Sequence, residues 1–161
     1  VWGHIAMWHP SVYGASDPDD WQNVGIVQPL LNKPFDEWWF HGRIDSEPTE
    51  VLELPAGGRV TVELACNKQL TSMGNTRKTT NNNPCPDDSN SFHAGKPVQD
   101  DQIRGCALAV VDVEDAKDAG KDQMAVFSTN HTCVKYRFTD FEIPANMPEC
   151  SGRNCICAWF W

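Results

Sequence analysis

Arg59-Val-Thr-Val-Glu-Leu-Ala-Cys66 is the stretch that decides the fold class. Apolar and polar side chains alternate along it, so that one face is apolar and the opposite face carries Thr61 and Glu63. A period of two residues is typical of a β-strand with one buried and one exposed face. The stretch therefore predicts a strand that turns one face toward a core. The apolar face consists of Val60, Val62, Leu64 and Cys66.

Other short apolar or aromatic segments on either side of this stretch are also expected to be strands. The last of them, Cys155 to Trp161, is apolar on both faces, which favours a place inside a sheet rather than at its edge. Residues 67–105 are expected to form a long irregular loop, and residues 114–121 a short helix or a hairpin loop. The expected strands are Ile5 to Trp8, Glu37 to Gly42 (a strand or strand edge), Cys106 to Val113, Met124 to Ser128, Cys133 to Phe138, Phe141 to Ile143 and Cys155 to Trp161.

Many short strands separated by turn signals are typical of a β-sandwich. The chain has 161 residues, enough for one domain, and no low-complexity linker or internal repeat divides it. The prediction is an all-β fold, an immunoglobulin/fibronectin-like antiparallel β-sandwich with long loops, stapled by disulfides.

The charge balance excludes some partners. The formal net charge is -9, which disfavours nucleic acid and anionic membranes, because both attract basic surfaces. No apolar run is long enough to cross a membrane. An acidic surface is compatible with a neutral polymer such as a polysaccharide. The seven tryptophans add to this expectation, because exposed indole rings can lie against sugar faces.

Secretion is indicated by three features. Seven cysteines without zinc-finger spacing indicate a disulfide framework in an oxidising compartment, and an odd number leaves at least one without a partner in the chain. Asn130-His-Thr132 is a glycosylation sequon. Val1-Trp-Gly3 resembles the end of a cleaved signal peptide, so residues 1–3 are expected to be its remainder and residues 4–161 a single domain.

Cleavage after Gly3 would place a histidine at the amino terminus. The α-amine and ring Nδ1 of His4 could then chelate one metal ion, and a second imidazole would complete a three-nitrogen site suited to copper. His9 should point to the opposite strand face, and His131 lies in the sequon. His41 and His93 remain as the candidate second ligand; His93 ranks slightly higher because it lies in the long loop near a cysteine.

Several blocks of the sequence, in order and over nearly the whole chain, resemble the fungal lytic polysaccharide monooxygenases of auxiliary activity family 14. One block alone would be a weak signal, but together they are specific. The blocks are His4-Ile-Ala-Met-Trp-His-Pro-Ser-Val-Tyr-Gly14, Phe35-Asp-Glu-Trp-Trp-Phe-His41, Leu54-Pro-Ala-Gly57, Val62-Glu-Leu-Ala-Cys-Asn-Lys68, Pro84-Cys-Pro86, Gly105-Cys-Ala107, Val126-Phe-Ser128, Asn130-His-Thr-Cys-Val134, Tyr136-Arg-Phe-Thr-Asp-Phe141, Pro144-Ala-Asn-Met-Pro148 and Cys155-Ile-Cys-Ala-Trp-Phe-Trp161.

The resemblance implies a β-sandwich with a copper-binding histidine brace formed by His4 and His93, and glycosylation of Asn130. It also implies the disulfides Cys66–Cys85, Cys106–Cys133 and Cys150–Cys155, with Cys157 unpaired. The family places an axial tyrosine after the segment that ends here at Trp161, and neither Tyr13 nor Tyr136 matches it. The expectation is therefore a domain that lacks its C-terminal part.

The activity implied by the resemblance is copper-dependent oxidative cleavage of xylan associated with cellulose. An external electron donor would reduce the copper, and the protein is expected to be a secreted monomer. Two alternatives remain open. One is a secreted copper-binding protein of the same fold without oxygenase activity. The other is a carbohydrate-binding module that holds no metal.

Overall fold

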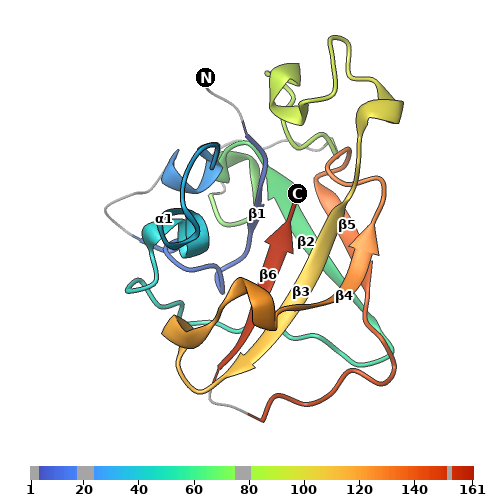
Figure 1. Cartoon of the computed structure of the whole chain (residues 1–161). Coiled ribbons are helices and arrows are strands. Elements are labelled where there is room, and N and C mark those ends of the chain that lie inside the picture. The colour runs from blue at the N-terminus through green and yellow to red at the C-terminus, as the bar shows by residue number, and fades with distance from the viewer. Residues whose placement is uncertain (1–3, 18–23, 75–80, 152–153) are drawn as a thin grey trace.

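Two three-stranded antiparallel sheets form the body of the molecule (Figure 1). The structure is a computed structural model that describes residues 4–17, 24–74, 81–151 and 154–161. The first sheet has the order β1-β2-β5 and the second β4-β3-β6. The strands are β1 (Ala6–Trp8), β2 (Arg59–Ala65), β3 (Cys106–Val113), β4 (Ala125–Asn130), β5 (Phe138–Glu142) and β6 (Asn154–Phe160).

The helical elements are one short α-helix and several 3₁₀ turns, which lie in the connections between strands. In Figure 1, α1 lies beside β1 and away from β4 and β5. No helix in the described ranges is long and apolar enough to cross a membrane. The helical elements are η1 (Val24–Val27), α1 (Phe35–Trp38), η2 (Trp39–Gly42), η3 (Lys68–Leu70), η4 (Ser89–Phe92), η5 (Asp100–Gln102), η6 (Ala116–Asp118) and η7 (Lys121–Gln123).

The main core lies between the two sheets, which confirms the all-β sandwich expected from the sequence. The apolar face of β2 packs there as its alternation predicts, with Val62 2% and Leu64 0% exposed. β5 contributes Phe141, and β3 contributes Leu108 from the other sheet; both are fully buried. Full burial of a large aliphatic or aromatic side chain contributes about 1.5–3 kcal/mol, so each of these residues stabilises the packing of the two sheets.

Two segments expected to be strands are not strands. Residues 37–42 form the end of α1 and η2, and Phe35 and Trp39 stack with ring centroids 5.2 Å apart. That stack joins residues four positions apart, which is a helical rather than an extended contact. Residues 133–137 form turns that lead into β5, and Lys135 N donates to Thr132 O across one of them. Both strand predictions relied on aromatic and apolar content alone, and that content does not distinguish a strand from a helical or turn segment.

β6 is an edge strand among the described strands and not an interior one, which corrects the expectation for Cys155 to Trp161. It pairs with β3 alone, from Ala107 opposite Phe160 to Val113 opposite Asn154. Both faces are nevertheless apolar for a physical reason. One face packs on the main core through Trp159, and the other packs through Ile156 on a smaller cluster that includes Val113.

Three disulfides cross-link the chain, with sequence separations of 19, 27 and 5 residues. Their Cα atoms are 5.4–5.8 Å apart, within the usual range. They are Cys66–Cys85, Cys106–Cys133 and Cys150–Cys155, the same pairs that the family resemblance implies. Cys157 in β6 is a free thiol, and burial raises its pKa to about 12. A thiol held this far from ionisation is a poor nucleophile and a poor metal ligand at neutral pH.

Candidate metal centre

His4 is held at the start of β1 by buried neighbours. Ile5 is 1% exposed and packs in the main core, and the β1 residues that follow pair with β2, beginning at Ala6 opposite Ala65. The imidazole of His4 itself is half-buried. A ring that directly precedes such an anchored strand has a well-defined position, although it lies near the beginning of the chain.

His93 caps η4 in a conformation that is unusual for a side-chain-bearing residue. Its φ of 52° and ψ of 31° place it in the left-handed region, and its N–H donates to Asn90 O. The flanking residues Phe92 and Ala94 are buried, whereas His93 is exposed. The backbone strain is therefore held by two buried anchors that turn the imidazole outward. Strain of this kind, about 1–3 kcal/mol, is often found at functional sites.

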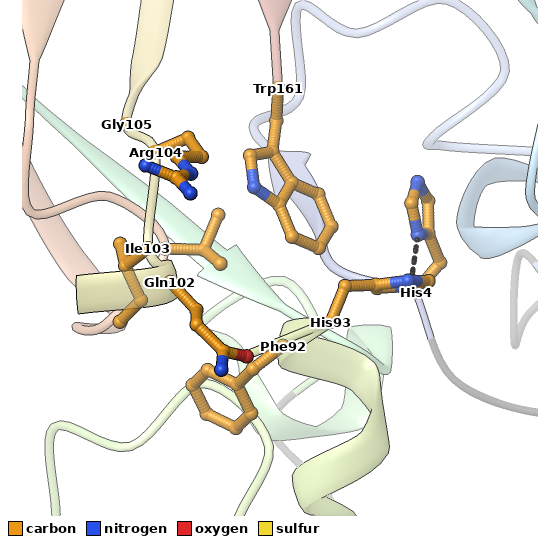
Figure 2. Close-up of a pocket in the computed structure, with 9 residues that line it drawn as sticks. His4, Phe92, His93, Gln102, Ile103, Arg104, Gly105 and Trp161 are labelled. Atoms are coloured by element: carbon orange, nitrogen blue, oxygen red, sulfur yellow. Dashed lines mark hydrogen bonds between the residues drawn. The ribbon is translucent and has the colours of Figure 1, made fainter. Parts of the chain in front are cut away.

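The two imidazoles meet, although 89 positions separate them in the sequence. His4 Nδ1 lies 3.2 Å from His93 Nε2, and the rings are nearly perpendicular, with an interplanar angle of 88° (Figure 2). The long loop brings His93 to this place because the Cys66–Cys85 disulfide fixes its first part to the end of β2. The Cys106–Cys133 disulfide, at the start of β3, holds the loop at its other end.

Trp161 is a site residue that sequence reasoning placed only in a strand. It follows β6 directly, and its ring centroid lies 4.8 Å from that of His4 and 5.4 Å from that of His93. The indole thus covers one side of both imidazoles. The aromatic residues of the Trp159-Phe-Trp161 block were visible in the sequence, but nothing local indicated that the last of them would contact the histidine pair.

A pocket of about 320 Å³ opens beside the histidine pair. Trp161 and Phe92 give it apolar walls, and Gln102 and Arg104 add an amide and a guanidinium. In Figure 2 the histidines lie on one side of the pocket and Arg104 on the other, with Trp161 between them in this view. The pocket is open enough to admit part of a larger molecule and is not sealed from solvent.

The environment keeps His4 uncharged. Desolvation lowers its pKa from 6.5 to about 4, and the nearby His93 and His41 rings add to the effect when charged. A neutral imidazole has a free lone pair for a metal ion, whereas a protonated one has none. Protons therefore compete with a metal for His4 only in strongly acidic solution.

We expect the His4 ring in the metal-free protein to titrate with a midpoint near pH 4. The folded pKa is depressed, so the unfolded chain binds this proton more readily. The stability associated with neutral His4 is thus complete above about pH 6.5 and is lost as the pH falls toward 4. NMR titration of the His4 ring protons measures the midpoint, and the urea-unfolded chain is the control, expected near 6.5. A folded-state midpoint of 6 or higher would contradict the burial argument.

The residues present fit a copper ion bound partly by the backbone. Metal–imidazole bonds are about 2.0–2.1 Å long, so one ion can reach two nitrogens that lie 3.2 Å apart. In the described ranges no group of three or more His, Cys, Asp or Glu side chains could hold a metal. Two imidazoles alone make an incomplete site. The α-nitrogen of His4, if free, is the donor that would complete it, and nitrogen donors suit copper.

The other histidines do not form a pair with His4. His41 is in η2 with Nδ1 buried and without a hydrogen-bond partner among the described residues, and desolvation lowers its pKa. His9 Nδ1 accepts from the backbone N–H of Ser11. His131 is exposed beside Asn130, whose side-chain oxygen accepts from the N–H of Thr132. Sequence reasoning left His41 and His93 nearly equal, and the structure brings only His93 into hydrogen-bond range of His4.

The chain is similar to known proteins over almost all of its length. The family model described as "Lytic polysaccharide monooxygenase AA14" matches residues 1–161. AA14 family lytic polysaccharide monooxygenase B from Trametes coccinea is 40% identical over 168 residues, which cover 99% of this chain and 40% of the relative. The B protein of Pycnoporus cinnabarinus is 41% identical, with 99% and 44% covered. The A protein of Trametes coccinea is 39% identical, with 98% and 38% covered. The chain thus spans about two fifths of the length of these relatives.

Proposed function

Because the chain belongs to the AA14 family of lytic polysaccharide monooxygenases, we propose that it binds copper through His4 and His93 and takes part in the oxidative cleavage of a polysaccharide. The observation that carries the proposal is the distance of 3.2 Å between His4 Nδ1 and His93 Nε2. Two imidazole nitrogens from residues 89 positions apart in the sequence face each other beside an open pocket, which is what a shared ion requires.

Each residue of the site has a distinct part in this proposal. His4 would bind the ion through Nδ1 and its α-nitrogen, and His93 through Nε2. Copper bound there would supply the one-electron chemistry that activates dioxygen or peroxide. Trp161 covers one side of both rings and so restricts their rotation and the approach of water from that side. The pocket beside them is where a sugar unit would present a C–H bond.

The finer parts of the proposal concern substrate, partners and location. We propose xylan associated with cellulose as the polysaccharide and an external electron donor as the reductant. The net charge of -9 supports a partner other than nucleic acid or an anionic membrane. Secretion, removal of residues 1–3, a monomeric state and a glycan on Asn130 belong to the same proposal, and the three disulfides support an oxidising compartment.

We expect copper-loaded protein supplied with a reductant to release oxidised oligosaccharides from xylan-coated cellulose. Mass spectrometry of the soluble products identifies the added oxygen, and omission of the reductant or of copper is the control. Tight copper binding without oxidised products would instead favour a copper-binding protein that has no oxygenase activity. Sugar binding that is unchanged by His4→Ala, without a copper signal in electron paramagnetic resonance, would favour a carbohydrate-binding module.

A further inference from the structure

The pocket beside the histidine pair differs in charge from the rest of the molecule. The protein carries 22 acidic and 13 basic residues, yet no carboxylate from the described part of the chain lines this pocket. Its one formally charged lining side chain, among the described residues, is the guanidinium of Arg104. In a protein with a net charge of -9, a pocket whose charged side chain is a guanidinium favours an anionic ligand at that place.

Arg104 is available to a ligand. Its side chain is exposed, and no ion pair joins it to a carboxylate of the described residues. Asp100, which lies four positions before Arg104 in the sequence and outside the pocket lining, binds Lys135, with Nζ 2.5 Å from Oδ2. This carboxylate is therefore paired with a lysine and not with Arg104.

The chemistry of the remaining wall fits a sugar that carries a carboxylate. A guanidinium presents two parallel N–H groups that match the two oxygens of a carboxylate. Gln102 can donate to or accept from a sugar hydroxyl, and Trp161 and Phe92 offer apolar ring faces. A small inorganic anion would use the arginine alone, whereas a sugar acid would use all of these groups.

We propose that this pocket binds a uronic acid substituent of the polysaccharide, with its carboxylate on Arg104. The inference rests on the proposed function and deepens it. It specifies an acidic, uronate-bearing hemicellulose as the substrate class. In this arrangement Arg104 is a specificity-determining residue, because a carboxylate held there fixes which part of the polymer backbone faces His4 and His93.

The test compares two xylo-oligosaccharides of equal backbone length, one with a single glucuronic acid branch and one unbranched. NMR titration of the metal-free protein, followed at the indole N–H of Trp161, gives both dissociation constants. We expect the acidic oligosaccharide to bind about 5- to 10-fold more tightly at low salt, and the preference to shrink as salt is added. Arg104→Gln should abolish the preference. Arg104→Lys should retain only part of it, because an ammonium lacks the planar fork.

Lys121→Gln is the control with the same change of charge, because Lys121 is exposed in η7 and does not line the pocket. It should retain the full preference. Equal binding of both oligosaccharides by the wild-type protein, or a full preference in Arg104→Gln, overturns the inference and leaves the proposed function standing. Acetate that competes as well as glucuronate overturns it too, because the pocket would then accept any small anion. Binding of neither oligosaccharide counts against both this inference and the proposed function.

Discussion

His93→Ala is expected to weaken copper binding by at least about 100-fold and to abolish the release of oxidised oligosaccharides. The substitution removes one of the two imidazoles that face each other across 3.2 Å, and no third metal-binding side chain among the described residues can replace it. Loss of groups that merely orient a metal ligand typically costs 10- to 100-fold in affinity, so loss of the ligand itself should cost more. Competition titration against a chelator of known copper affinity measures the change.

The matched control is His131→Ala, which also removes an exposed imidazole and keeps the Asn130-x-Thr132 sequon intact. It should bind copper as the wild-type protein does. Alanine at position 93 must still adopt a φ near 52°, so thermal unfolding of the metal-free variant should be recorded as well. A folded His93→Ala protein with wild-type copper affinity would rule out the histidine pair as the metal centre.

A chain that begins at His4 is expected to bind copper at least about 100-fold more tightly than one that retains Val1-Trp2-Gly3. With residues 1–3 attached, the nitrogen of His4 is part of a peptide bond, and its lone pair is delocalised into the carbonyl. Such a nitrogen is a poor ligand. The two imidazoles would then remain without the third nitrogen donor that the described side chains do not supply.

The control for this prediction distinguishes loss of the free amine from steric crowding of the site by residues 1–3. A chain that begins at His4 but whose α-amine is acetylated lacks the amine donor and carries only a small addition, and it should bind as weakly as the longer form. The electron paramagnetic resonance spectrum of Cu(II) reports the number of nitrogen donors independently of affinity. Equal affinities and identical spectra for all three forms would mean that the His4 nitrogen is not a ligand.

The alternation of apolar and polar residues correctly predicted a strand and its buried face where only one face of the strand is buried. Val62 and Leu64 lie in the core as their period of two predicts, and the predicted strand Cys106 to Val113 coincides with β3. The apolar pattern gave a wrong prediction where the second face of a strand is covered by something other than a neighbouring strand. The segment Cys155 to Trp161 is apolar on both faces because a second cluster covers the face that turns away from the main core, not because strands flank it on both sides.

The aromatic block at residues 37–42 shows a different limit. Large aromatic side chains favour strands on average, yet here Phe35 and Trp39 stack across one helical turn, and Trp39 Nε1 donates to Ala119 O. That acceptor lies 80 residues away, so no local propensity contains the information. A tertiary hydrogen bond and a ring stack therefore decide the conformation of this block.

The candidate site divides in the same way. The residues alone determined that a histidine behind a plausible cleavage site could chelate a metal through two of its own nitrogens, because that depends on covalent structure only. They did not determine the partner: His41 and His93 were nearly equal until family likeness favoured one. Only the tertiary structure places His93, Trp161 and Arg104 at the same pocket as His4. The sandwich brings together segments that are far apart along the chain, and such contacts produce no periodic pattern in the sequence. Local sequence patterns indicate which face of a strand is buried. The short distance between two imidazoles 89 positions apart, in contrast, depends on the packing of both sheets and on the two disulfides that hold the long loop.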